Sequence, residues 1–237
     1  SVAGALLIVA GAGGLVIFGV WELRTKSPVL DMRLFFNNRA FAFSNLTALL
    51  NYMATFAVGF LLSLYLQYIK GFTPRDAGLI LVIQPVVMAL VSPMAGKLSD
   101  RMEPRIIASA GMALTTAGLI PLILLNRSAG LAQVYTALAV LGLGFALFAS
   151  PNMNAIMSSV DKRSYGVASG TAGTMRLVGQ MFSMGLTMLI FAVFIGRVRI
   201  TPEYYDLFVK SMKIAFAILS FFCFCGIFAS LARGKVR

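Results

Sequence analysis

One basic residue, Arg176, lies well inside a long apolar stretch of the 237-residue sequence. Small and polar residues flank it at intervals of three or four positions: Ser169, Gly173, Gln180, Ser183 and Thr187. At about 100° per residue, this spacing places all of them on one face of a helix. A charge at such depth normally faces a bundle interior or a water-filled cavity, so the stripe predicts a cavity wall. The alternative is that Arg176 pairs with carbonyl groups of a neighbouring helix and the small residues permit close packing.

A second polar face lies in the apolar segment 40–69. Ser44, Thr47, Asn51 and Thr55 share one side of the expected helix, with Tyr52 beside them. An amide inside lipid needs a hydrogen-bonding partner, which makes Asn51 the strongest candidate here for substrate contact, with Tyr52 and Thr55 next to it. Small polar residues at this spacing also join helices to one another, and the sequence supports that interpretation equally.

The ionisable residues exclude several kinds of chemistry. The sequence has no histidine, and its two cysteines, Cys223 and Cys225, point to nearly opposite sides of a helix. We therefore expect no metal site and no cofactor. All eight carboxylates fall in loops or at the ends of apolar segments: Glu22, Asp31, Asp76, Asp100, Glu103, Asp161, Glu203 and Asp206. A lipid-acting enzyme would need clustered acids, histidines or a serine–lysine pair, so we expect no enzymatic activity.

The composition indicates which elements position these residues. The chain is 59% hydrophobic and 12% charged, with a mean hydropathy of +0.88, whereas about a quarter of the residues of a soluble domain are charged. Seven apolar segments are long enough to cross a bilayer as helices: Val2–Trp21, Ala40–Ile69, Ala77–Lys97, Ile106–Leu125, Leu131–Pro151, Gly166–Ile195 and Phe208–Leu231. The predicted fold class is all-α and integral to the membrane, with seven transmembrane helices.

The net charge of +12 is confined almost entirely to the connections between these segments. In a soluble protein it would suggest a nucleic-acid partner. Here the basic residues lie in short loops, where they orient the chain and meet lipid headgroups, so we expect no nucleic acid. Twelve of the twenty Lys and Arg residues fall in one set of loops and seven in the other. This excess places the first set, and the C-terminus, in the cytoplasm.

The longest loop of the cytoplasmic set, segment 22–39, divides the chain. Residues 1–21 form a leading transmembrane helix, and residues 40–237 form a block of six helices. The linker between them could lie on the membrane surface as a short amphipathic helix. The first residues are apolar and glycine-rich, with neither a Met nor the basic start of a signal peptide. We therefore expect the sequence to begin inside a longer protein.

Three short patterns make local predictions. Thr73, followed by Pro74 and Asp76, predicts a helix N-terminus, and Gln84-Pro85 predicts a kink. Residues 96–105, Gly-Lys-Leu-Ser-Asp-Arg-Met-Glu-Pro-Arg, join two spans by a tight turn in which Asp100 has Arg101 and Arg105 within reach. Such a charge cluster would tie two helices together and act as a latch if it broke when the protein opened inward. The alternative is an ordinary charged turn that obeys the positive-inside rule.

The turn 96–105 resembles the signature loop of the major facilitator superfamily, G-x-L-x-D-R-x-G-R-K/R. The matching positions are Gly96, Leu98, Asp100, Arg101 and Arg105. Glu103 and Pro104 replace the usual Gly and Arg, which fits the more degenerate copy found in the second half of these proteins. Residues 71–78 resemble the external turn that precedes the span ending in this loop. Three further stretches resemble the later helices of the fourteen-helix drug:proton antiporter branch: 151–154, 166–170 and 176–179.

The resemblance implies the C-terminal half of such a transporter, with one extra central helix followed by a six-helix domain. It implies a multi-pass antiporter of the cell membrane that performs multidrug efflux, exporting drug-like or hydrophobic small molecules in exchange for protons. Its partners would be the small-molecule substrate, the proton, membrane lipids and the N-terminal half of the same transporter, which would carry the protonatable group. The alternatives are a non-catalytic membrane scaffold or subunit and, with less support, a lipid-acting membrane enzyme.

Overall fold

The computed structural model describes residues 32–196 and 200–234, together with residues 10, 11, 13, 14, 16, 17 and 19–22 of the first apolar segment. Within these residues, six helical stretches are long and apolar enough to cross a membrane: Arg39–Ile69, Pro74–Arg101, Pro104–Ile123, Leu131–Ser158, Lys162–Phe194 and Pro202–Ala232. They correspond to the last six predicted segments. More than half of the leading segment Val2–Trp21 and half of the 22–39 linker lie outside the described residues, so the seventh span stays a prediction.

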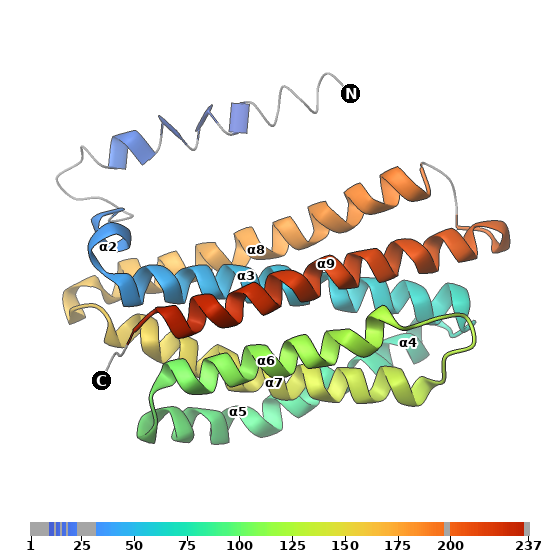
Figure 1. Ribbon diagram of the computed structural model, residues 1–237, viewed down its shortest axis with the longest axis horizontal. Helices are drawn as coiled ribbons and strands as arrows, with labels where there is room; N and C mark the ends of the chain where they lie inside the picture. Colours follow the sequence, from blue (N-terminus) through green and yellow to red (C-terminus); the bar gives the residue numbers. More distant parts are fainter. Residues whose placement is uncertain are drawn as a thin grey trace.

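The chain builds these spans from helices that run alternately between the two ends of the molecule (Figure 1). A short helix α2 (Met32–Asn37) precedes α3 (Arg39–Leu64), which continues into a π-helical turn η1 (Tyr65–Ile69). The remaining elements are α4 (Pro74–Leu81), α5 (Ile83–Arg101), α6 (Pro104–Ile123), α7 (Leu131–Ser158), η2 (Lys162–Ser164), α8 (Tyr165–Phe194), η3 (Pro202–Tyr204) and α9 (Tyr205–Ala232). The described part of the chain is therefore an all-α six-helix bundle.

The predicted helix start at Thr73 is confirmed. The Thr73 hydroxyl accepts a hydrogen bond from the Asp76 backbone N–H at 3.2 Å and donates to the Asp76 carboxylate at 2.7 Å, while Pro74 occupies the first turn of α4. This pairing supplies an acceptor to a backbone donor that a helix N-terminus otherwise leaves without a partner.

The kink predicted at Gln84-Pro85 is also present, as a break between α4 and α5 at Val82. Pro85 has no backbone N–H, so it cannot donate to the carbonyl of Leu81, four residues earlier. For the segment Leu131–Pro151, the predicted end at Pro151 is wrong, because α7 continues through Pro151 to Ser158. A proline inside a membrane helix is tolerated where neighbouring helices pack around it, and Pro151 is buried.

Helix packing defines the two ends of the bundle. Helix α6 packs on α7 and α9, α3 packs on α8 and α9, and α5 packs on α7. The close approach of α6 to α7 requires glycine, since a Cβ on Gly111 would lie 2.7 Å from the Gly144 carbonyl oxygen. The end that holds the start of α3, the α5–α6 turn and the C-terminus is called the C-terminal end below. The η1–α4 turn and the α6–α7 connection lie at the opposite end (Figure 1).

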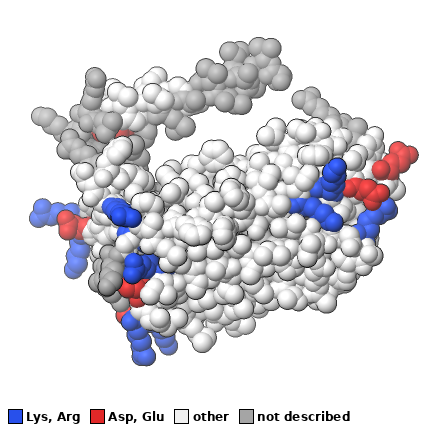
Figure 2. All heavy atoms as spheres, viewed as in Figure 1, with Lys and Arg blue, Asp and Glu red and all other residues white. Residues whose placement is uncertain are grey.

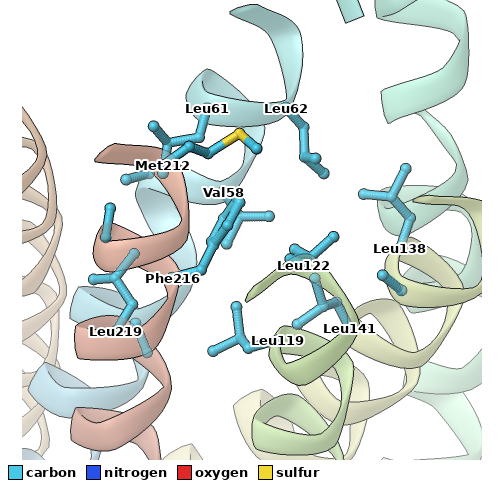
Figure 3. Close-up of a cluster of buried hydrophobic side chains, with 14 of the residues drawn as sticks. Val58, Leu61, Leu62, Leu119, Leu122, Leu138, Leu141, Met212, Phe216 and Leu219 are labelled. Atoms are coloured by element: carbon cyan, nitrogen blue, oxygen red, sulfur yellow. The ribbon is translucent and has the colours of Figure 1, made fainter. Parts of the chain in front are cut away.

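The largest apolar core lies toward the opposite end. Most of its buried residues come from α3, α6, α7 and α9, and α4, α8 and η1 add a few more. The side chains drawn in Figure 3 include Val58 and Leu61 of α3, Leu119 and Leu122 of α6, Leu141 of α7, and Phe216 of α9. On the face seen in Figure 2, Lys, Arg, Asp and Glu lie at the two ends, and the broad band between the ends carries none of them. This distribution is the one expected of a bundle whose middle is surrounded by lipid.

Candidate functional site

A cavity of about 230 Å³ lies between α3, α7 and α8, in the half of the bundle nearer the C-terminal end. Its lining includes Tyr52 from α3, Asn152 from α7, and Ser169, Gly173 and Arg176 from α8. Phe148 and Ile156 of α7 add apolar surface. Four of the lining side chains can donate a hydrogen bond, and one of them is permanently charged. The cavity therefore combines apolar walls with a cluster of donors inside the span region.

Arg176 and Tyr52, both predicted from the sequence, meet across this cavity. The Arg176 side chain is exposed and lies within electrostatic range of the Tyr52 hydroxyl. The Tyr52 ring packs edge-to-face on Phe145 of α7, with ring centroids 5.5 Å apart. The ring contact fixes the direction of the tyrosine, so its hydroxyl stays beside the guanidinium.

The rest of the predicted stripe on α8 lies elsewhere. Ser183 and Thr187 are fully buried, and neither lines the cavity. The Ser183 hydroxyl accepts a hydrogen bond from the Ala57 backbone N–H at 3.0 Å, and Thr187 donates to the Ser183 carbonyl oxygen at 2.9 Å. Gln180 is half-buried between these two regions. The structure thus divides one predicted stripe into a cavity-lining part and a part packed on α3.

The division follows from one close contact. A Cβ on Gly179 would lie 2.6 Å from the Leu49 carbonyl oxygen, so α8 and α3 touch through their backbones at this point. From Gly179 onward α8 covers α3, whereas the turns before it leave space for the cavity.

The predicted candidates on α3 divide in the same way. Tyr52 lines the cavity, but Asn51 and Thr55 are buried and do not. Thr55 donates to the Asn51 carbonyl oxygen at 2.9 Å. The Asn51 side-chain amide is buried without a hydrogen-bond partner in the structure. Burial of an amide without a partner costs free energy, about 1–3 kcal/mol for a group of this kind, so it is an unusual feature of this helix.

A buried arginine that the sequence did not single out lies next to the cavity. Arg233, directly after α9, is only 1% exposed. Its guanidinium donates to the Ser44 hydroxyl at 3.2 Å, the Asn152 side-chain oxygen at 3.0 Å, and the Ser230 hydroxyl at 2.6 Å. The Ser230 hydroxyl also accepts from Ser109 of α6 at 2.7 Å. We refer to Ser44, Ser109, Asn152, Ser230 and Arg233 as the Arg233 network, which joins α3, α6, α7 and α9.

The charge of Arg233 is retained despite its burial. Desolvation lowers the pKa of its guanidinium to about 10, partly opposed by the negative charge of Glu103. Because this pKa stays well above 7, Arg233 is cationic at neutral pH. Sequence reasoning placed it with the loop residues because it follows the last apolar run and precedes Lys235 and Arg237. The signal that could have identified it is the three-residue spacing from Ser230, which places both on one helix face.

The turn 96–105 projects largely into solvent. Leu98, Asp100 and Arg101 are exposed, and Gly96 and Arg105 are half-buried. Ser99 and Pro104 are buried, and the Ser99 hydroxyl accepts a hydrogen bond from the Asn154 amide of α7 at 2.9 Å. Pro104 opens α6, as its position in the sequence predicts. The role of the turn as a latch stays a prediction.

Among the described residues, no group of three or more His, Cys, Asp or Glu side chains is placed to hold a metal ion. Cys223 is buried and Cys225 is half-buried, and neither forms a disulfide. The chemistry of the site thus rests on hydrogen-bond donors and a cation.

Comparison with known proteins identifies the family. Residues 44–235 match the family profile described as the Major Facilitator Superfamily, and this range covers most of the chain. The chain belongs to the Major Facilitator Superfamily. The six described spans are accordingly a half-bundle of this superfamily, which confirms the predicted all-α, membrane-spanning fold class for the described residues.

Similar superfamily proteins carry transporter or resistance names. The chain is 31% identical over 169 residues to the riboflavin transporter RibZ of Clostridioides difficile, over 70% of this chain and 37% of RibZ. It is 28% identical over 196 residues to the multidrug resistance protein Stp of Mycobacterium tuberculosis, over 83% of this chain and 36% of Stp. It is 28% identical over 192 residues to the methyl viologen resistance protein SmvA of Salmonella typhimurium, over 80% of this chain and 37% of SmvA.

These relationships point to transport rather than to enzymatic catalysis. The chain spans well under half the length of each of these relatives.

Proposed function

We propose that this chain is the C-terminal part of a multi-pass secondary active transporter that exports drug-like or hydrophobic small molecules. The observation that carries the proposal is the cavity between α3, α7 and α8, which places a cation and three further donors among apolar walls. Membership of the superfamily and the resistance names of Stp and SmvA support export as the direction.

The proposed transporter contains parts beyond the six-helix domain. Residues 1–21 form its leading transmembrane helix, and residues 22–39 form the cytoplasmic linker. An N-terminal half of the same protein supplies the opposite wall of the substrate path. The protein lies in the cell membrane, and its C-terminus lies in the cytoplasm. Substrate would bind between the halves and be released by rocking of one half against the other.

Proton coupling is the proposed energy source. None of the residues that line the cavity is a carboxylate, and the eight carboxylates of the sequence lie in connections or at span ends. Exchange of substrate for a proton requires a group that changes protonation within the path. We assign that group to the N-terminal half, while this half contributes substrate contacts and the turn 96–105 acts as a latch between states.

The test is expression of the full-length protein in a bacterial host that lacks its own drug pumps. The expected result is reduced accumulation of ethidium, which returns to the level of the empty host when a protonophore collapses the proton gradient. Accumulation of both ethidium and the anionic dye fluorescein equal to that of the empty host, with the protein present in the membrane, would contradict transport. Reduced accumulation that a protonophore does not affect would contradict proton coupling alone.

Variants connect the assay to the cavity. Tyr52→Ala and Arg176→Ala are expected to change the substrate profile without lowering the amount of protein in the membrane. Arg163→Ala is the matched control, because Arg163 is an exposed arginine just before the same helix and lies outside the cavity lining. If the Arg176 and Tyr52 variants behave like the control toward every compound tested, the cavity has no role in substrate binding.

A further inference from the structure

The cavity between α3, α7 and α8 has a definite electrostatic character. Its polar side chains are the Arg176 guanidinium, the Tyr52 and Ser169 hydroxyls and the Asn152 amide. Arg176 can only donate hydrogen bonds, and the others can donate as well as accept. Since no carboxylate lines this cavity, the net charge of its wall is positive.

The Arg233 network adds to the positive electrostatic character of the cavity, because Arg233 lies behind the lining residue Asn152. Arg233 donates to the Asn152 side-chain oxygen at 3.0 Å, and Asn152, which is 3% exposed, donates through its nitrogen to the Ser44 carbonyl oxygen at 3.1 Å. Because Arg233 has no acceptor to offer, the Asn152 oxygen must point toward it and the NH₂ group must point the other way. One of the two N–H groups on the Asn152 nitrogen donates to the Ser44 carbonyl oxygen, and the second N–H is not used by that bond.

Two guanidinium groups therefore act on the same small space. Arg176 lines it directly, and Arg233 lies one side chain behind Asn152. Arg233 is buried, where charge interactions are screened less than in water. An anionic group in the cavity would be attracted by both cations, whereas a cationic group would be repelled by both.

The size of the cavity limits what enters it. About 230 Å³ is smaller than the roughly 300–1,000 Å³ of a pocket that holds a drug-sized molecule. The cavity fits one functional group of a larger ligand, and the rest of the ligand would lie against the opposite wall of the substrate path, which the proposed N-terminal half supplies.

We propose that this cavity is a subsite for an acidic group, a carboxylate or a phosphate, of the molecule that the transporter carries. The inference rests on the proposed transport function and adds a substrate class to it. Arg176 makes the direct ionic contact, Tyr52 and Asn152 donate hydrogen bonds to the acid, and Arg233 is a positioning residue that orients Asn152. The acidic group has two possible sources, a soluble organic anion or the headgroup of an anionic lipid.

The first experiment measures export of two fluorescent compounds by the full-length protein in pump-deficient cells. Fluorescein is an anion at neutral pH, and ethidium is a cation. The proposal expects that Arg176→Ala lowers fluorescein export about tenfold and leaves ethidium export unchanged or raised, and that Arg176→Lys keeps much of the fluorescein export. Arg163→Ala, the exposed control, should alter neither.

A second variant adds a negative charge to the cavity wall with almost no change in side-chain size. Asn152→Asp keeps an acceptor for Arg233, replaces the nitrogen that donates to the Ser44 carbonyl oxygen with a second carboxylate oxygen, and so adds a negative charge to the cavity wall. It should lower fluorescein export and leave ethidium export at least as high as in the parent. Equal loss of both compounds in Arg176→Ala and Asn152→Asp would overturn the proposal, because it would indicate a general defect.

The same assay separates this inference from the proposed function. Export of ethidium without export of fluorescein by the parent protein would overturn the acidic subsite and leave transport intact. Export of neither would overturn transport and the subsite together.

Reconstituted vesicles distinguish the two sources of the acid. Fluorescein transport is measured in phosphatidylcholine vesicles with added phosphatidylglycerol or with added soluble glycerol phosphate. Competition by the lipid alone identifies a lipid headgroup as an occupant, and competition by the soluble phosphate identifies a solute. Absence of competition by both would contradict a subsite for acidic groups.

Discussion

The two ends of the half-bundle are held together by different interactions. At the opposite end, apolar side chains of α3, α6, α7 and α9 fill the space between helices (Figure 3). At the C-terminal end, the same four helices are joined by hydrogen bonds of the Arg233 network. The Asn38 amide adds a hydrogen bond to the Ser159 carbonyl oxygen, and Arg39 donates to the Ala232 carbonyl oxygen at 2.8 Å.

The difference matters because lipid is as apolar as the core side chains. Apolar side chains gain little by leaving lipid for a helix interface, so the apolar core at the opposite end is held mainly by packing, with a few hydrogen bonds such as that from the Tyr65 hydroxyl to the Asn126 carbonyl oxygen at 2.7 Å. A buried polar group, in contrast, loses several kcal/mol of hydrogen bonding if its partner is displaced. The Arg233 network therefore defines one arrangement of the helices around the cavity, and the apolar core tolerates more adjustment.

The largest effect is expected from Arg233→Met, which keeps an unbranched apolar side chain, although a shorter one, and removes all of the donors of Arg233. The acceptors Asn152 Oδ1 and Ser230 O would be left buried without donors, at a cost of about 3 kcal/mol. Thermal unfolding in detergent micelles measures this loss. Arg39→Ala is the exposed control and should cost less than about 1 kcal/mol.

A double variant sharpens the same comparison. Arg233→Met combined with Asn152→Leu removes donor and acceptor together, and it should recover part of the lost stability. If the single Arg233→Met variant is as stable as the parent, the free-energy cost of desolvating the guanidinium equals the stabilisation that its hydrogen bonds provide.

The next largest effect is expected from Gly142→Ala, at a close contact between helices. A Cβ at this position would lie 2.6 Å from the Gln84 carbonyl oxygen of α5, and backbone cannot move aside as a side chain can. The expected cost is about 2 kcal/mol. Gly59→Ala is the matched control within α3, since its added Cβ meets nothing within 4 Å, and it should be neutral or slightly stabilising. Equal stability of the two variants would contradict the backbone contact.

A smaller effect is expected from Leu122→Ala in the apolar core. Leu122 is fully buried, but in lipid the loss includes only packing and cavity contributions, about 1 kcal/mol, and not the transfer from water. The same unfolding measurement in micelles applies. A loss larger than that of Arg233→Met would reverse the ranking of the two ends.

The smallest effect is expected at the surface of the opposite end. Arg127 and Asp206 form an ion pair at 3.3 Å, with side chains 52% and 81% exposed. Exposed pairs contribute little because water screens them, so Asp206→Asn should change stability by less than about 0.5 kcal/mol. A loss of more than about 1 kcal/mol would show that this pair belongs to a larger charge network.

Much of the fold could be predicted from the sequence because its determinants are local. Apolar length located the last six spans, and the Thr73 cap and the Gln84-Pro85 break follow from side-chain and backbone chemistry within one turn. The end of α7 could not be predicted in this way. Proline inside a membrane helix depends on its neighbours, and neighbours are a tertiary property.

The candidate site shows the same limit. Periodicity placed Ser169, Arg176 and Ser183 on one face of α8, but it could not show that α8 touches α3 at Gly179 and covers the later part of that face. Arg233 was missed for a related reason, because only the packing of four helices reveals that a residue after the last span is buried. The cavity role of Arg176 and Tyr52 stays a proposal.

The most direct measurement of the central claim is cysteine labelling in the full-length protein. Cys223 and Cys225 are first replaced by serine or alanine, and Ser169→Cys or Leu189→Cys is added. Ser169 lines the polar cavity, whereas Leu189 of the same helix lines an apolar groove of about 590 Å³ with Phe182 and Phe222. A water-soluble maleimide should label position 169 and not position 189, and a transported compound should slow that labelling. Equal labelling of both positions, or labelling at 169 that no transported compound slows, would contradict a substrate path along the cavity between α3, α7 and α8.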